Sequence, residues 1–377
     1  MKIKETKGRL YSGAGFGFLQ NVLSAFGMLL LPMYFSSLDI SIAVYAFLLS
    51  IGDIFAFILK PIIGYYTDKY GERRFLLIGI LALTLSLYFI GQTSDILSIV
   101  ILKIISSIAG ALLFVLILIY GLRAVGAKPD KKVGLFRGLF SVGWIGLLLP
   151  GVVMDNFGSS FTFYLVLFIG LFWLIITHFY TKKYEIKKKV SFKPSLSFMR
   201  KVPLLLIYKI VDISIFNAFL FFFVRYALQS LGLSRSIVSI IVVVEVLVFS
   251  IGLLLVSRIS TKSRRKYWIP LSMFIHIIGI ITMVFASELL HYFLASALFG
   301  LAGIFMDLWI YSRISETVKR YDKGKVIGTY GWSFDIATIL GAQVPLLFIS
   351  FGFNPFVSLF VFPIAGILTY ILSKMKV

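Results

Sequence analysis

The chain has 377 residues, of which 59% are hydrophobic and 14% charged, and its formal net charge is +21. A soluble domain carries roughly 25% charged residues, and this chain has many apolar runs near the ~20 residues that a membrane-spanning helix needs. An integral membrane protein is therefore expected. The absence of cysteine excludes disulfides, thiol catalysis and cysteine-ligated metal. Four basic residues precede the first apolar run, which is too long for a signal peptide and predicts an uncleaved span.

The apolar runs predict twelve membrane-spanning helices. In chain order they cover residues 11–35, 41–66, 74–91, 96–120, 134–154, 161–180, 203–228, 236–257, 268–286, 289–314, 326–350 and 354–374. The predicted fold class is all-α integral membrane. Its predicted domains are an N-terminal six-helix bundle at 1–180, a basic cytoplasmic linker at 181–202 and a C-terminal six-helix bundle at 203–377.

Basic residues gather on one side of this predicted topology. Nearly all of the 37 lysines and arginines lie in the two termini, the linker and the loops of that side, and the opposite loops contain only Arg235. This bias predicts that both termini are cytoplasmic in a multi-pass protein of the cell membrane. The basic loops then face anionic lipid, so the positive charge does not indicate a nucleic-acid partner.

A short charged turn, GYYTDKYGERR at 64–74, follows the second predicted helix. The residues that fit the form G-x-x-x-D-K-x-G-x-R-R are Gly64, Asp68, Lys69, Gly71, Arg73 and Arg74. The turn resembles the signature of the major facilitator superfamily (MFS) between its second and third helices, although Glu72 departs from that pattern. An ordinary positively charged loop is the alternative. The resemblance implies a cytoplasmic gate switched by Asp68. It also implies two pseudo-symmetric six-helix bundles that alternate access to a central site.

Ionisable residues within predicted spans are costly and tend to face a bundle interior or a wet cavity. They are Asp53, Lys60, Lys103, Lys209, Asp212, Arg225, Glu245, Asp307 and Asp335. None falls on the third, sixth, ninth or twelfth predicted helix. The family resemblance implies that those four helices face lipid and that the other eight line a central cavity. His276 lies on the ninth helix, where a neutral imidazole has a low free-energy cost in the membrane.

Candidates for proton coupling or for the substrate cavity are polar residues of the inner helices: Gln20, Asn21, Asp53, Lys103, Glu245 and Asp335. Asp53 could instead form a structural pair with Lys103. Glu245 has no partner on its own helix, and burial there would favour the protonated form, which suits a proton carrier. Asp335 lies roughly on the same side of its helix as Thr338, which suggests cavity lining; a packed interhelical hydrogen bond is the alternative.

The other ionisable residues are predicted to be structural. Lys209 and Asp212 are spaced i,i+3 and are expected to pair. Lys60 and Arg225 are predicted to extend toward the cytoplasmic and outer surfaces. Asp307 is expected near the cytoplasmic end of its helix, where it could pair with basic loop residues.

Two features resemble the proton-coupled exporters of the superfamily. Lys103 precedes a run of small residues in ILKIISSIAG, where those exporters usually have an arginine. Lysine differs from arginine because it can lose its proton when desolvated. The predicted helix 134–154 is rich in glycine around Pro150, although close helix packing is the more general explanation of such glycines.

No enzymatic constellation competes with transport. The three histidines lie on separate spans without metal-ligand spacing, and there is no Walker-type phosphate loop, so no enzyme activity and no cofactor are expected. We predict a monomeric secondary transporter of a small organic solute, coupled to protons, with export by antiport slightly favoured. The alternatives are a proton-symport importer of sugar or carboxylate, and a non-transporting sensor or scaffold of the same fold.

Overall fold

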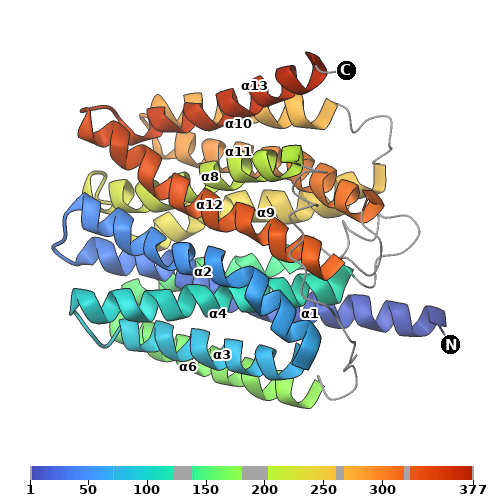
Figure 1. Ribbon diagram of the computed structural model, residues 1–377. Helices are drawn as coiled ribbons and strands as arrows, with labels where there is room; N and C mark the ends of the chain where they lie inside the picture. The colour runs from blue at the N-terminus through green and yellow to red at the C-terminus, as the bar shows by residue number, and fades with distance from the viewer. Residues whose placement is uncertain are drawn as a thin grey trace.

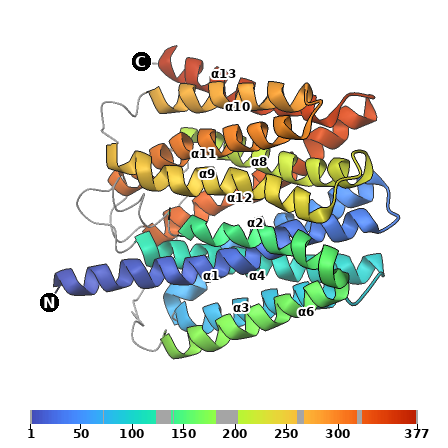
Figure 2. The same ribbon diagram turned by 180° about the vertical axis from the view of Figure 1, so that it is seen from behind.

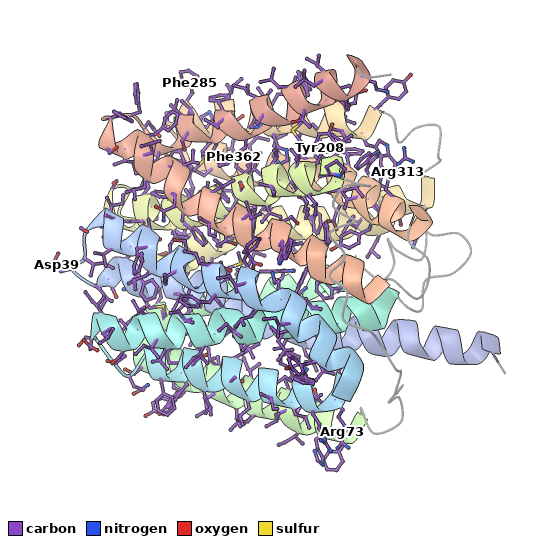
Figure 3. All side chains as sticks on the ribbon, viewed as in Figure 1. Asp39, Arg73, Tyr208, Phe285, Arg313 and Phe362 are labelled. Carbon is purple, nitrogen blue, oxygen red and sulfur yellow. The ribbon has the colours of Figure 1, made fainter. Side chains whose placement is uncertain are left out.

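The computed structural model describes residues 2–70, 72–122, 138, 140–180, 203–259, 267–317 and 323–375. Every regular element in these ranges is a helix. The helices run along one common direction, and α1 begins at the same end of the bundle at which α13 ends (Figures 1 and 2). We call this the termini end, where Arg73 and Arg313 lie, and the other the short-loop end, where Asp39 and Phe285 lie (Figure 3).

The helices follow the predicted spans closely. The first half contains α1 (Lys2–Ser37), α2 (Ile42–Tyr70), α3 (Glu72–Ile90), α4 (Ile96–Leu122), η1 (Gly143–Leu147) and α6 (Leu148–Tyr180). The second half contains α8 (Pro203–Gln229), α9 (Arg235–Ile259), α10 (Trp268–Val284), α11 (Leu289–Thr317), α12 (Lys323–Ser350), η4 (Pro355–Phe360) and α13 (Val361–Met375). Residues 134–137 and 139 of the predicted fifth span lie outside the described residues.

The long helix α6 combines parts of two predicted spans. Gly158 within it has a φ of 81°, a left-handed conformation that only glycine adopts readily. The chain reverses there, so the segments before and after Gly158 run in opposite directions (Figure 2). In the described part of the chain, 10 helical segments are long and apolar enough to cross a membrane; one, Phe140–Phe179, includes this reversal, and Trp268–Val284 is shorter.

Side-chain caps hold the tight turns at the short-loop end. Oδ2 of Asp95 accepts hydrogen bonds from the hydroxyl of Ser98 at 2.7 Å and from its backbone N–H at 2.8 Å. These two bonds satisfy donors at the start of α4 and hold the pKa of the Asp95 carboxyl below its usual range. Asn354 caps η4 in the same way by accepting from the N–H of Phe356 at 2.8 Å.

The helices expected to face lipid lie at the two edges of the bundle. Figure 1 shows α3 and α6 along one edge, α10 and α13 along the other, and the remaining labelled helices between them. Large apolar side chains are exposed on these edge helices, among them Phe168, Phe172, Phe274 and Leu372. This is the surface a bilayer requires, and it leaves the inner helices to surround polar groups.

Candidate functional site

A cavity of about 240 Å³ lies between helices of the two halves. We call it the central cavity. It gathers every predicted cavity residue except Glu245: Gln20, Asn21, Asp53, Lys103 and Asp335. α1, α2 and α4 supply these residues from the first half, and α12 supplies Asp335 from the second. The sequence therefore indicated groups that the fold brings to one place.

Two amides stand on the α1 wall of the central cavity. Asn21 is fixed, because its Nδ2 donates to the carbonyl oxygen of Phe140 at 2.7 Å. Gln20 is also buried, but its Oε1 has no hydrogen-bond partner among the described residues. Such an acceptor is costly to leave unpaired, so Gln20 is a natural partner for a donor on a bound solute.

Asp53 and Lys103 form a loose acid–base pair within the first half. Nζ of Lys103 lies 4.0 Å from Oδ2 of Asp53 and donates instead to Oγ of Ser107 at 3.0 Å. α2 and α4 approach closely at Gly52, which has no Cβ; a Cβ added there would overlap Ser107. The Asp53 and Lys103 side chains are 18% and 13% exposed, so neither member of this loose pair is fully sealed from the cavity.

Lys60 and Asp335 form a tight pair that joins the two halves. Nζ of Lys60 donates to Oδ1 of Asp335 and to the carbonyl oxygen of Gly331, each at 2.7 Å. Only 3% and 4% of the two side chains are exposed. The prediction that Lys60 extends to the cytoplasmic surface is wrong. α2 continues to Tyr70, so Lys60 lies ~15 Å along the helix from that end.

Further contacts accompany this pair between α2, α4 and α12. Nε2 of Gln343 donates to Oγ of Ser50 at 3.0 Å. The rings of Phe114 and Phe334 pack with their centroids 4.6 Å apart, and Nζ of Lys60 lies 5.9 Å from the centre of the Phe114 ring. The two halves therefore meet through charge, amide and aromatic contacts.

Glu245 lies in a second cavity, of about 110 Å³, surrounded mainly by helices of the second half. Glu245 was predicted to share a cavity with Asp53, but the two residues line different cavities. Glu245 is 7% exposed, and its Oε2 has no hydrogen-bond partner in the described part of the chain. Three aromatic residues line both cavities: Phe114, Trp144 and Phe334. The two cavities are therefore neighbours that share a wall.

Lys209 joins two carboxylates beside this second cavity. Its Nζ lies 2.8 Å from Oδ2 of Asp212, as the spacing predicted, and 3.0 Å from Oδ1 of Asp307. Asp307 is 1% exposed and pairs with Lys209 of α8; its pairing with loop bases stays a prediction. Nε2 of His276 lies 3.8 Å from Oδ1 of Asp212. His276 was predicted to have no function, although a polar residue on an apolar edge helix was a signal that could have indicated one.

At the short-loop end, α8 contacts the turn between α1 and α2. Arg225 extends to this end, as predicted, and its Nη2 donates to the carbonyl oxygen of Ile40 at 3.1 Å. Its guanidinium lies 4.9 Å from the centre of the Tyr45 ring. Gln229 donates to the carbonyl oxygen of Ser36 at 3.0 Å. These bonds connect the two halves a second time.

A third connection joins α6 to the start of α9. Oδ2 of Asp155 accepts from the N–H of Ser236 at 2.8 Å and from its hydroxyl at 2.6 Å. The N–H of Gly151 donates to Oγ of Ser239 at 3.0 Å. A Cβ on Gly151 would overlap the carbonyl oxygen of Arg235. This glycine serves close packing, as the general explanation held.

The structure describes little of the predicted gate at 64–74. Gly71 lies outside the described residues. Gly64, Asp68 and Lys69 belong to α2, but their side chains are also outside the described part. Nη2 of Arg73 donates to the carbonyl oxygen of His178 at 3.1 Å, and Arg74 is exposed. The gating role of this turn stays a prediction.

Comparisons with known proteins agree on one family. A family model described as Major Facilitator Superfamily matches residues 14–342. The uncharacterized MFS-type transporter YuxJ of Bacillus subtilis (strain 168) is 22% identical over 145 residues. That match spans 38% of this chain and only 37% of the relative's length.

Two solved structures resemble the whole chain. The human organic anion transporter MFSD10 (TETRAN) has a TM-score of 0.72 at 12% identity, covering 97% of this chain and 98% of its own. The proton:xylose symporter XylE, bound to 6-bromo-6-deoxy-D-glucose, has a TM-score of 0.71 at 15% identity, covering 98% and 96%. At these identities the likeness establishes the fold alone.

Proposed function

The chain belongs to the major facilitator superfamily, whose members are non-enzymatic membrane transporters, and we propose that it is a secondary active transporter. It carries a small organic solute across the cell membrane by alternating access. One observation carries this proposal. The central cavity contains two acid–base pairs, and one of them, Lys60 with Asp335, connects α2 of one half to α12 of the other. A single chain provides the cavity, so the proposed transporter acts as a monomer.

The proposed moving units are residues 1–180 and 203–377. The excess of basic residues in the loops supports an orientation with both termini in the cytoplasm. The short-loop end then faces outward, and the contacts of Arg225 with Ile40 and of Asp155 with Ser236 close that side. Opening the cavity outward requires these bonds to break.

Protons are the proposed coupling ion. Protonation of Asp335 would remove the attraction that holds Lys60, and with it a link between α2 and α12. Asp53 lies seven residues before Lys60, on a similar face of α2, and provides an alternative anion for that lysine. Asp53, Glu245 and Asp335 are the proposed proton-exchanging groups, while Lys60 and Lys103 compete with protons for the carboxylates.

The 64–74 turn is the proposed cytoplasmic latch. If the chain transports, Asp68→Asn should reduce turnover and leave thermal stability unchanged, with the exposed Asp39→Asn as the matched control. A sensor or scaffold of the same fold has no turnover for this substitution to reduce. The resemblance of Lys103 and of the glycine-rich segment to exporters favours antiport over import.

Purified protein in liposomes loaded with a pH-sensitive dye tests the proposal. Sugars, carboxylates, amino acids and organic cations are added outside in turn, and the proton flux is recorded. A flux evoked by one solute class, lost in Asp53→Asn and kept in the exposed control Glu288→Gln, supports coupled transport, and its sign gives the direction. Movement of labelled solute without proton flux contradicts the coupling. Movement of no solute contradicts transport.

A further inference from the structure

The second cavity combines an unpaired acid with aromatic walls. Only 7% of Glu245 is exposed, and its buried Oε2 lacks a hydrogen-bond partner among the described residues. The lining is otherwise mainly apolar and includes Phe216, Phe249 and Phe299 from α8, α9 and α11. A buried carboxylate oxygen without a donor is costly, and this cavity offers it the space for one.

The charges around this cavity are unbalanced. Lys209 is one base, and it already contacts two acids, Asp212 and Asp307. Among the described residues that line the cavity, Glu245 is a second acid beside Asp212, and the basic side chain that remains besides Lys209 is His276, whose Nε2 lies 3.8 Å from Asp212. The central cavity differs, because its two acids face two lysines. A cation would offset the excess negative charge in the second cavity and would be redundant in the central one.

The shared aromatic wall already receives cations from protein side chains. Nζ of Lys60 lies 5.9 Å from the Phe114 ring, and Nζ of Lys209 lies 5.5 Å from the Phe334 ring. Aromatic faces attract ammonium groups at such distances. The rings of Phe216, Phe249 and Phe299 give the second cavity the same kind of surface, without an ammonium group described over them.

We propose that the second cavity binds the ammonium group of an organic amine, which displaces the proton of Glu245 and takes its carboxylate as counter-ion, with the three phenylalanines as walls. The apolar body of the solute passes Trp144 and reaches the larger central cavity. This inference rests on the proposed transport function and names its substrate class. It assigns Glu245 to recognition of the solute, a role that none of the four charged residues of the central cavity fills.

Three solutes test the proposal: 2-phenylethylammonium, 2-phenylethanol and 3-phenylpropionate. They share a phenyl ring and a short chain, and differ in whether the end group is a cation, neutral or an anion. Their binding to the full-length protein in lipid nanodiscs is measured by calorimetry at neutral pH. We expect the cation to bind about tenfold or more tightly than the alcohol, and the anion not to bind. Equal affinity for the cation and the alcohol in the unaltered protein would overturn the proposal without any variant.

Glu245→Gln keeps the shape of the side chain and removes its charge. We expect Glu245→Gln to lower the affinity for the cation by about tenfold and to leave the affinity for the alcohol unchanged. Unchanged binding of the alcohol would also show that the cavity is folded. Glu288→Gln, at an exposed position, should change neither. Unchanged cation affinity in Glu245→Gln would refute the role of Glu245. Glu245→Asp should restore the preference for the cation in part.

The binding assay is independent of transport. If the amine binds through Glu245 and no solute moves in liposomes, the transport proposal fails and the amine site stands. If liposomes show coupled movement of another solute and the amine does not bind, the amine site fails and the transport proposal stands.

Discussion

Nζ of Lys60 lies 2.7 Å from Oδ1 of Asp335, although 275 residues separate them in the chain. Both side chains are almost completely buried. A buried pair of this kind contributes little net stability relative to apolar residues of the same shape, but either charge alone is strongly unfavourable. The pair therefore couples the positions of α2 and α12. That is the property a contact needs if it is to form in one state of a transporter and break in another.

The first prediction concerns the stability of this pair. Asp335→Asn leaves the Lys60 ammonium without its counter-charge and should lower the free energy of unfolding by about 3–5 kcal/mol. Combining Lys60→Met with Asp335→Leu should recover most of that loss, because no charge remains buried. Thermal unfolding in detergent measures both. A double variant as unstable as Asp335→Asn would argue against pairing.

Gly151→Ala tests the packing of α6 on α9. The added methyl group would overlap the backbone of Arg235, so the two helices must separate at the short-loop end. We expect a lower melting temperature and a slower transport cycle. Gly15→Ala is the control, because a Cβ at Gly15 meets nothing within 4 Å. Equal effects of the two substitutions would show that helix propensity, and not packing, is responsible.

Asp53→Asn should uncouple protons from solute. The loose 4.0 Å contact with Lys103 implies a small structural contribution, so the variant should fold with nearly unchanged stability. Labelled solute should still equilibrate across liposomes, and solute-driven acidification should fall to the background. Asp39→Asn, at an exposed position, should keep both solute equilibration and solute-driven acidification. If Asp53→Asn retains full proton flux, Asp53 is not a coupling residue.

A reversible crosslink tests whether the α6–α9 contact must open. The chain has no cysteine, so Asp155→Cys with Ser236→Cys introduces one unique pair where the native side chains lie 2.6 Å apart. Oxidation should stop transport, and reduction should restore it. Each single variant controls for the loss of the native hydrogen bond. Full transport by the oxidised protein would show that this end does not open.

The helices and their lipid-facing edges could be predicted from the sequence. The apolar runs set the helix lengths, which are properties of single segments. The family resemblance implied which four helices face lipid, and the absence of Asp, Glu, Lys and Arg from the middle of those four spans agreed with it. Lys209 with Asp212 was predictable from a single segment as well, since i,i+3 residues share a helix face.

The partners across helices could not be predicted. Whether Lys60 meets Asp335 depends on how α2 and α12 rotate against each other, and a periodic pattern within one helix does not encode this. Asp307 joined Lys209 for the same reason. Glu245 and Asp53 looked alike as single acids in apolar runs, but the aromatic wall of Phe114 and Phe334 places them in different cavities.

We infer that the Lys60–Asp335 pair holds the two halves together near the termini end. Spin labels at Phe179→Cys on α6 and Arg258→Cys on α9, both exposed near that end, report the distance between the halves by pulsed electron paramagnetic resonance. A second labelled pair, Asp39→Cys with Glu288→Cys, monitors the short-loop end. We predict that Asp335→Asn shifts the first distance distribution to longer values, and that Lys60→Met with Asp335→Leu restores it. A distribution that Asp335→Asn leaves unchanged would contradict the account.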